Sequence, residues 1–136
     1  MKLFFKLFVL FVCCQVSAQV EKSFDDGLEK FVKRDFKNAS IAFAAVIKMD
    51  SKNYEAHYYS GVCNIRLNNY KTALLNFDKA IELHPKYAKA YYNRGVAKFY
   101  LSENENGCLD FRKALELQPG YDEAITAIMQ FCNKKK

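Results

Sequence analysis

The stretch that decides the fold is YKTALLNFDKAIELHP at residues 70–85, because residues 105–119 repeat its pattern as ENGCLDFRKALELQP. Matching residues in the two copies are always 34 positions apart. The pairs at this separation are Gly61/Gly95, Phe77/Phe111, Ala80/Ala114 and Pro85/Pro119. A fixed period of this length predicts a stack of similar supersecondary units that share one core.

The period also extends toward the N-terminus, where a more degraded copy occupies residues 20–53. Its matching residues are Gly27, Ala39, Phe43 and Val46, and Ser51 stands in the proline position. The chain therefore contains three copies, at about residues 20–53, 54–87 and 88–121.

Apolar residues recur at helical spacing in each copy, which predicts an all-α fold. We expect two helices in each copy, the second closed by a polar turn or by proline, which cannot continue a helix. Asn53 is expected to cap a helix, and Ser102 with Glu105 fits a capping box. The expected helices are 21–34, 37–49, 54–67, 70–83, 87–101, 106–117 and 121–133.

The last expected helix, 121–133, has the pattern of a cap. Ile125, Ile128 and Met129 lie on one of its faces and polar residues lie on much of the rest. A stack of repeats needs such a helix, because its terminal unit otherwise exposes an apolar flank.

These residues resemble the tetratricopeptide repeat family, whose unit is a helix A, a tight turn and a helix B. The resemblance implies an α-solenoid of three repeats plus a capping helix. It also implies that small residues lie where paired helices touch, with Gly61 and Gly95 on helix A facing Ala80 and Ala114 on helix B. The phenylalanines at 77 and 111 are expected to fill the wedge between neighbouring units.

The resemblance further implies a function, because the A helices of this family line a concave groove that holds an extended peptide or a helix of a partner protein. Tyrosine is common at such binding surfaces. An alternative is that some of the tyrosines pack between adjacent A helices, so we expect about half of them to be accessible. The expected partner-binding residues are Phe24, Leu28, Tyr58, Tyr59, Val62, Arg66, Lys89, Tyr92, Asn93 and Val96.

One subtype of the family clamps the C-terminal carboxylate of cytosolic chaperones with a lysine and an asparagine on the first A helix. Phe24 and Leu28 stand in those positions here, and Tyr59 stands in the position of the asparagine on the second A helix. Among the residues compared, only Lys89 matches the clamp. The sequence therefore predicts a different partner.

Residues 1–18 have the composition of a secretory signal peptide. Lys2 and Lys6 precede an apolar run, and Val16-Ser17-Ala18 fits a cleavage site after Ala18. The alternatives are an uncleaved anchor, for which the run is short of the ~20 residues that span a bilayer, and a lipoprotein signal at Cys13 or Cys14. We expect an exported protein, periplasmic or associated with the bacterial cell envelope, whose repeat domain is residues 19–136.

The charge of the chain gives little reason to expect a nucleic-acid partner. Cleavage lowers the net charge from +6 to +4, because the removed segment carries two lysines and no acid. Part of the remainder lies in the tail Lys134–Lys136. A basic tail can meet nucleic acid or anionic lipid, but a solvated end whose charge stabilises the C-terminal dipole of the last helix is the favoured interpretation. An exported chain rarely meets nucleic acid, so we expect none as a partner.

The sequence contains no constellation that indicates enzyme activity. His57 and His84 each lack a second histidine at metal-ligand spacing, so both are interpreted as structural and no metal is expected. There is no glycine-rich phosphate loop, nucleophile elbow or zinc-protease motif. We therefore expect no catalytic residue, no cofactor and no small-molecule substrate.

Three cysteines remain after cleavage, at 63, 108 and 132. Export permits a disulfide. In the arrangement of the family, the end of an A-type helix lies beside the start of the preceding B helix, which places Cys132 near Cys108. A bridge between them that pins the cap is one hypothesis, and two small buried apolar side chains are the other. Cys63 is expected to be buried and free.

Two functions remain open from the sequence. The first is a non-enzymatic scaffold or adaptor that binds a protein segment in its groove. The second is a homo-oligomer that stacks through an imperfect cap, for which the candidates are Ile125, Ile128, Met129 and Phe131.

Overall fold

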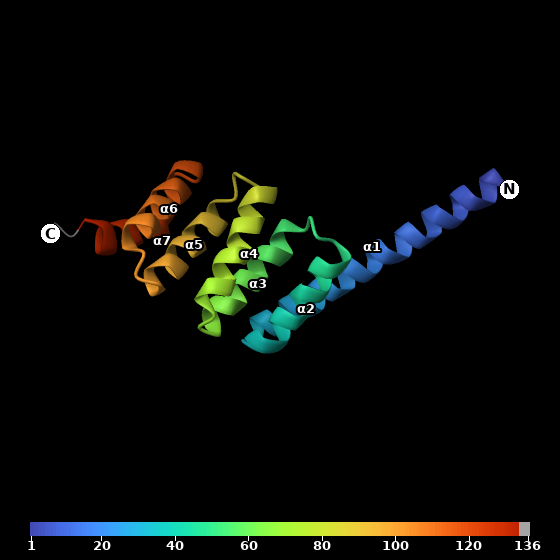
Figure 1. Cartoon of the computed structure of the whole chain (residues 1–136), viewed down its shortest axis with the longest axis horizontal. Helices are drawn as coiled ribbons and strands as arrows, with labels where there is room; N and C mark the ends of the chain where they lie inside the picture. The colour runs from blue at the N-terminus through green and yellow to red at the C-terminus, as the bar shows by residue number, and fades with distance from the viewer. Residues whose placement is uncertain (134–136) are drawn as a thin grey trace.

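A computed structural model of the chain describes residues 1–133, and the tail Lys134–Lys136 lies outside the described residues. Within them the protein is helical and contains no strand, as predicted (Figure 1). The elements are α1 (Lys2–Val32), α2 (Phe36–Met49), α3 (Tyr54–Arg66), α4 (Tyr70–Leu83), α5 (Ala88–Tyr100), α6 (Asn104–Leu117), α7 (Asp122–Ala127) and a π-helix η1 (Ile128–Cys132).

The helices pair in chain order and form a row of stacked units, α1 with α2, α3 with α4 and α5 with α6, followed by α7 and η1 (Figure 1). We call α1, α3 and α5 the A helices and α2, α4 and α6 the B helices. Each unit packs on the next, because the second helix of one unit contacts the first helix of the following unit. The predicted α-solenoid is confirmed.

Each A helix meets its B helix where a glycine lies against a phenylalanine ring. A Cβ atom at Gly61 would lie 2.7 Å from the ring of Phe77, and one at Gly95 would lie 2.7 Å from the ring of Phe111. Both rings are almost fully buried. The atoms nearest to each missing side chain thus belong to a phenylalanine rather than to Ala80 or Ala114, because a flat ring fills the space that the glycine leaves.

The turn between helices A and B has a residue with left-handed backbone conformation at the same position in every repeat. Arg34, Asn68 and Ser102 have φ values of 63°, 62° and 65° and are again 34 positions apart. A left-handed residue just after a helix lets the chain reverse and satisfies the last carbonyls of the helix. The capping box expected at Ser102 and Glu105 is absent, because Ser102 lies in this turn and the residue that precedes α6 is Glu103. The side chain of Glu103 makes no capping hydrogen bond. The helix α6 begins at Asn104, two residues before its expected start.

The turn between the first two repeats is organised by polar side chains. Asn53 caps α3, as expected, by accepting a hydrogen bond from the backbone N–H of Ala56 at 2.9 Å. The ring nitrogen Nε2 of His57 lies 3.1 Å from the backbone oxygen of Ser51. His57 thereby has a structural partner at the position where the first repeat lacks its proline.

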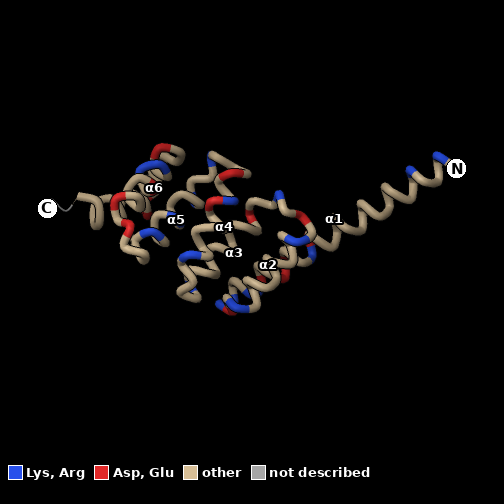
Figure 2. The backbone as a smooth tube through the Cα atoms, viewed as in Figure 1, with Lys and Arg blue, Asp and Glu red and all other residues tan. Residues whose placement is uncertain are grey.

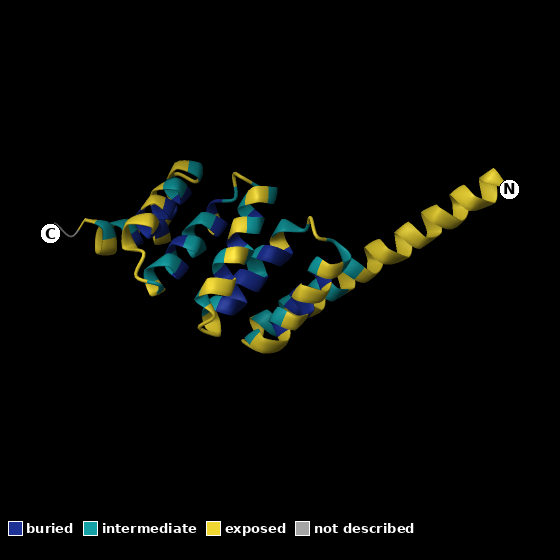
Figure 3. Ribbon diagram, viewed as in Figure 1, coloured by how far each residue is buried: buried dark blue, intermediate teal, exposed yellow. Residues whose placement is uncertain are grey.

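The first half of α1 extends away from the stack. Residues 1–19 are all exposed, so they contribute no side chain to the core (Figure 3). Between Lys6 and Glu21 this helix carries no charged residue (Figure 2). Among the described helices, α1 is the one long and apolar enough to cross a membrane, a property that signal sequences share.

The C-terminal cap continues as an α-helix for only six residues. Tyr121 stands just before α7 as Tyr87 stands just before α5, but the helix widens into the π-helix η1 from Ile128, where a single α-helix was expected. Met129 occupies the position that corresponds to Gly61 and Gly95, and 68% of it is exposed. A methionine there leaves no space for the ring of a further B helix.

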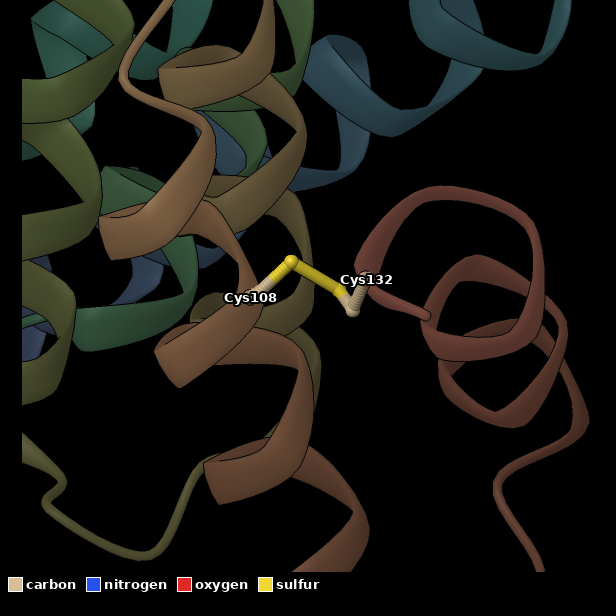
Figure 4. The surroundings of a disulfide bond; sticks show 2 residues. All are labelled: Cys108 and Cys132. Carbon is tan, nitrogen blue, oxygen red and sulfur yellow. A yellow bond between two sulfur atoms is a disulfide. The ribbon is translucent and has the colours of Figure 1, made fainter. Parts of the chain in front are cut away.

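The end of the cap is fastened to the third repeat. Cys108 in α6 and Cys132 in η1 form a disulfide, the bridge that was hypothesised, with their Cα atoms 5.7 Å apart (Figure 4). The ring of Phe131 lies 5.2 Å from that of Phe99 in α5. These two contacts attach η1 to both helices of the third repeat.

Candidate functional site

The A helices lie side by side, and aromatic rings form contacts between them. Tyr59 of α3 lies 5.3 Å from Phe31 of α1, measured between ring centroids. Tyr58 lies 5.0 Å from Tyr87, which precedes α5. The face that was expected to bind a partner therefore contains the seams between repeats.

Four of the ten expected binding residues belong mainly to the core. Phe24 and Leu28 pack with Phe43, and the ring of Tyr59 stacks on that of Phe43 at 5.3 Å. Val62 is buried in the cluster around Phe77. These side chains hold adjacent repeats together, as the alternative interpretation of the tyrosines anticipated.

The remaining expected residues reach solvent to different degrees. Tyr92 is half-buried against Phe111, with the two ring centroids 5.5 Å apart, and Val96 is also half-buried. Lys89 is exposed. Arg66 is exposed, and its guanidinium lies 5.9 Å from the centre of the Phe36 ring.

One polar contact connects two repeats across this face. The side-chain nitrogen of Asn93 donates a hydrogen bond to the hydroxyl of Tyr58 at 3.3 Å and another to the backbone oxygen of Lys89 at 2.9 Å. A backbone carbonyl accepts only, so the orientation of the Asn93 amide is fixed. Its side-chain oxygen is therefore an available acceptor, and the Tyr58 hydroxyl keeps its proton as an available donor.

Burial raises the pKa of the tyrosine hydroxyls on this face. It raises the pKa of Tyr58 to about 12, with a smaller contribution from Tyr59. Burial likewise raises the pKa of Tyr87 and Tyr121 well above the ordinary value of a tyrosine. All three hydroxyls therefore stay protonated to a more alkaline pH than an exposed tyrosine does.

A partly buried ion network, which the repeat pattern does not predict, lies between α4, α5 and α6. Arg94 donates two hydrogen bonds to Asp110, at 2.8 and 2.7 Å, and one to Asp78 at 2.7 Å. Lys98 also lies 2.7 Å from Asp110. Burial alone would lower the pKa of Arg94, but the hydrogen bonds with Asp110 and Asp78 outweigh burial and raise it.

The period of the repeats gives no signal for this network. The residues 34 positions before Arg94, Lys98 and Asp110 are Ser60, Asn64 and Asn76, all of them neutral. Ser60 and Asn64 are buried, and Asn64 donates a hydrogen bond to the backbone oxygen of Ser60 at 3.0 Å. A comparison of the pairs would have found that the third repeat replaces neutral polar residues with charged ones.

Reactive and metal-binding groups do not gather on this face. Burial raises the pKa of the free thiol of Cys63 to about 12, so it is a poor nucleophile. The ring of His84 stacks on that of Tyr87 at 5.6 Å. No group of three or more metal-ligating side chains is found among residues 1–133.

Comparisons with known proteins agree with the repeat fold. A family profile described as TPR repeat matches residues 65–102, and a tetratricopeptide repeat profile matches residues 88–121. No curated protein matches the sequence.

Solved structures with the same fold cover most of the chain. The first TPR domain of Spaghetti (RPAP3), bound to the HSP90 peptide SRMEEVD, is 24% identical with a TM-score of 0.82, over 85% of this chain and 92% of that domain. The TPR domain of Arabidopsis OM64 is 24% identical with a TM-score of 0.81, over 83% and 93%. The second TPR domain of human RPAP3, in complex with the HSP70 peptide SGPTIEEVD, is 24% identical with a TM-score of 0.82, over 88% and 99%.

Proposed function

This chain belongs to the tetratricopeptide repeat family, and from that premise we propose that it is a non-enzymatic scaffold that binds a segment of a partner protein along its A helices. The observation that carries the proposal is the pair formed by Asn93 and Tyr58. It offers one acceptor and one donor on a face that is rich in aromatic rings.

An extended peptide presents the complementary groups, because each of its residues carries one N–H donor and one carbonyl acceptor. The oxygen of Asn93 would accept the N–H, and the hydroxyl of Tyr58 would donate to the carbonyl. The half-buried ring of Tyr92 and the exposed ammonium group of Lys89 lie on the same helix as Asn93 and would contact the side chains of the peptide.

The structural neighbours that bind HSP90 and HSP70 peptides support a peptide as the partner. Those two peptides both end in Glu-Val-Asp and so carry acidic groups at their C-terminus. Phe24, Leu28 and Tyr59 lie in the core of this protein rather than in a basic clamp, and we propose that its partner is recognised through its backbone and not through a terminal carboxylate.

The test is selection from a displayed library of random peptides on the chain beginning at Gln19, followed by affinity measurements with one selected peptide. Tyr58→Phe and Asn93→Ala each remove one side of the pair and should weaken binding about 3- to 10-fold, as expected for one hydrogen bond. Asn106→Ala, on the exposed surface of α6, is the matched control. Equal affinity of all variants, or the recovery of no peptide, would refute the A-helix face as the site.

We propose further that the protein is exported and works in the bacterial periplasm or cell envelope. The apolar, wholly exposed first half of α1 supports this proposal. Expression in a bacterial host with an unmodified N-terminus should yield a chain that begins at Gln19 in the periplasmic fraction. Retention of residues 1–18 in a membrane fraction would favour the anchor instead.

Self-association through the cap is a second candidate function. The observation in its favour is that 68% of Met129 and 45% of Phe131 are exposed on η1. Sedimentation of the chain at increasing concentration, with Met129→Gln as the comparison, tests it. A monomer at all concentrations would remove this candidate.

A further inference from the structure

The outer surface of the B helices carries a row of apolar side chains that packing within the protein does not explain. Ile41, Leu75 and Leu109 stand at the same position of α2, α4 and α6, each 34 residues from the next. They are 61%, 70% and 61% exposed. Single exposed apolar residues are ordinary, but the same position is apolar and exposed in all three repeats.

The row does not belong to the core or to the proposed peptide site. In α2 the buried residues around Ile41 are Ala39, Ala42 and Phe43, and in α4 those around Leu75 are Ala73 and Phe77. The side chains of the row are thus on the face of each B helix that points away from the core. The proposed peptide site uses the A helices only.

Positive charges without a carboxylate partner surround the row. Lys37 and Lys71 lie one helical turn before Ile41 and Leu75, and Arg112 lies one turn after Leu109, which places each on the same helix face as its apolar neighbour. All three are exposed, and among residues 1–133 none forms a salt bridge. Lys48, two turns after Ile41, is exposed and unpaired in the same way.

The acidic residues of the B helices are mostly neutralised by other side chains. Asp78 is bound by Arg94, Glu82 by Lys79 and Glu116 by Lys113. The helix α2 has no acidic residue at all. Glu105, one turn before Leu109, is the exception, so the surface is positive around Ile41 and Leu75 and balanced around Leu109, where Arg112 offsets Glu105.

We propose that this row is a membrane-surface contact that binds anionic lipid. Apolar side chains that enter the boundary between headgroups and acyl chains, with lysine and arginine at the phosphate level, are the elements of such a contact. A second protein is less well matched, because three separated side chains cover far less than the ~800 Å² that each partner of a stable interface buries.

The experiment is flotation of the chain beginning at Gln19 with lipid vesicles, which avoids insertion of the apolar N-terminal segment. Residues 1–18 are exposed throughout, so the shorter chain keeps its core. It should bind vesicles that contain phosphatidylglycerol, bind those of phosphatidylcholine weakly, and release as salt is raised.

Two sets of variants test the row itself. Ile41→Ser with Leu75→Ser and Leu109→Ser should abolish flotation, whereas Val32→Ser with Leu67→Ser, which alters exposed apolar residues outside the row, should not. Lys37→Glu with Lys71→Glu should weaken partitioning by at least about fivefold per lysine. Circular dichroism melting of every variant checks that it is folded.

The proposal is overturned if the folded parent chain does not float with anionic vesicles or if the triple serine variant floats as well as the parent. It is also overturned if the row instead mediates self-association in sedimentation without vesicles, which would make it a protein contact. Tyr58→Phe, in the proposed peptide site, should leave flotation unchanged, so failure of the peptide proposal and failure of this one are separable.

Discussion

At the scale of single residues, the contact that recurs through the protein is a glycine beneath a phenylalanine ring. Gly27 with Phe43, Gly61 with Phe77 and Gly95 with Phe111 repeat it in the three units. The distance from a hypothetical Cβ atom to the ring is shorter than any ordinary van der Waals contact, so a side chain at these positions would force the ring to shift. This close approach lets the paired helices lie near one another.

Gly61→Ala should therefore destabilise the protein by about 1–3 kcal/mol, the usual cost of overpacking, although alanine is the better helix former by ~1 kcal/mol. Denaturant unfolding followed by circular dichroism measures the change. Phe77→Leu removes part of the ring that the new methyl group would strike, so Gly61→Ala should cost less in that background. An alanine variant at least as stable as the parent would show that the ring can move aside.

The buried tyrosines predict a dependence of stability on alkaline pH. The pKa of Tyr58 rises from 10.0 to about 12 on folding. The folded state thus holds a proton that the unfolded state releases, and stability is complete below pH 10 and falls as pH increases through this window. The midpoint of denaturant unfolding should decrease over this range, and Tyr58→Phe should reduce the decrease. A midpoint that rises with pH would contradict the assignment.

At the scale of the helix, the third repeat is fastened more strongly than the second. Arg94 and Lys98 on α5 converge on Asp110 of α6, and Arg94 also reaches Asp78 on α4. The side chain of Asp110 is 6% exposed and that of Asp78 is 57% exposed. The two carboxylates therefore bind the same arginine in very different surroundings.

Asp110→Ala should cost about 3–5 kcal/mol of stability, because it leaves two cations without their buried partner. Asp78→Ala should cost ~1 kcal/mol or less, because solvent screens that pair. Unfolding in denaturant compares the two variants directly. High salt should reduce the stability loss caused by Asp78→Ala and leave the loss caused by Asp110→Ala nearly unchanged. Similar losses for both would show that the burial of Asp110 is unimportant.

Much at this scale followed from the sequence, because the period fixes which residues are equivalent. The helices from α2 to α5 were predicted to within one or two residues at their ends, and the capping role of Asn53 was predicted from its position. The contacts of Gly61 and Gly95 with Phe77 and Phe111 were not predicted, since small residues on both helices leave open which side chains touch. The network of Arg94 was missed because a period reveals what repeats, and this network occurs in one unit.

The candidate site was the least predictable part. The register placed Tyr58, Tyr59 and Tyr92 on the A helices, but a pattern on one helix cannot say how far the neighbouring helix covers it. Tyr59 is stacked within the first seam, whereas Tyr58 keeps a hydroxyl available. The π-helical end of the cap carries no sequence signal that we can identify.

At the scale of the whole molecule, the stack consists of three units with different ends. A long apolar helix extends from the N-terminal unit, and the cap is fastened by a disulfide at the other end (Figures 1 and 4). The two proposed contacts occupy different faces, the A helices for a peptide and the B helices for lipid. A chain that made both contacts would bring its peptide partner to a membrane surface.

The disulfide should stabilise the cap more than the rest of the stack. It closes a loop with a sequence separation of 24 residues. Replacing both cysteines by serine should lower stability by about 2–4 kcal/mol. Hydrogen exchange should show faster exchange in α7 and η1, with α1 to α4 less affected. Uniform loss of protection along the chain would indicate that the cap does not unfold as a separate unit.

Met129 has a consequence for how this protein can change in length. Adding or losing a unit is the simplest way for a gene that encodes such an array to vary, and each addition needs a receptive last helix. The side chain of Met129, where the other units have glycine, prevents the cap from pairing with a further B helix. An engineer who wished to append a fourth unit would have to begin by restoring glycine at position 129.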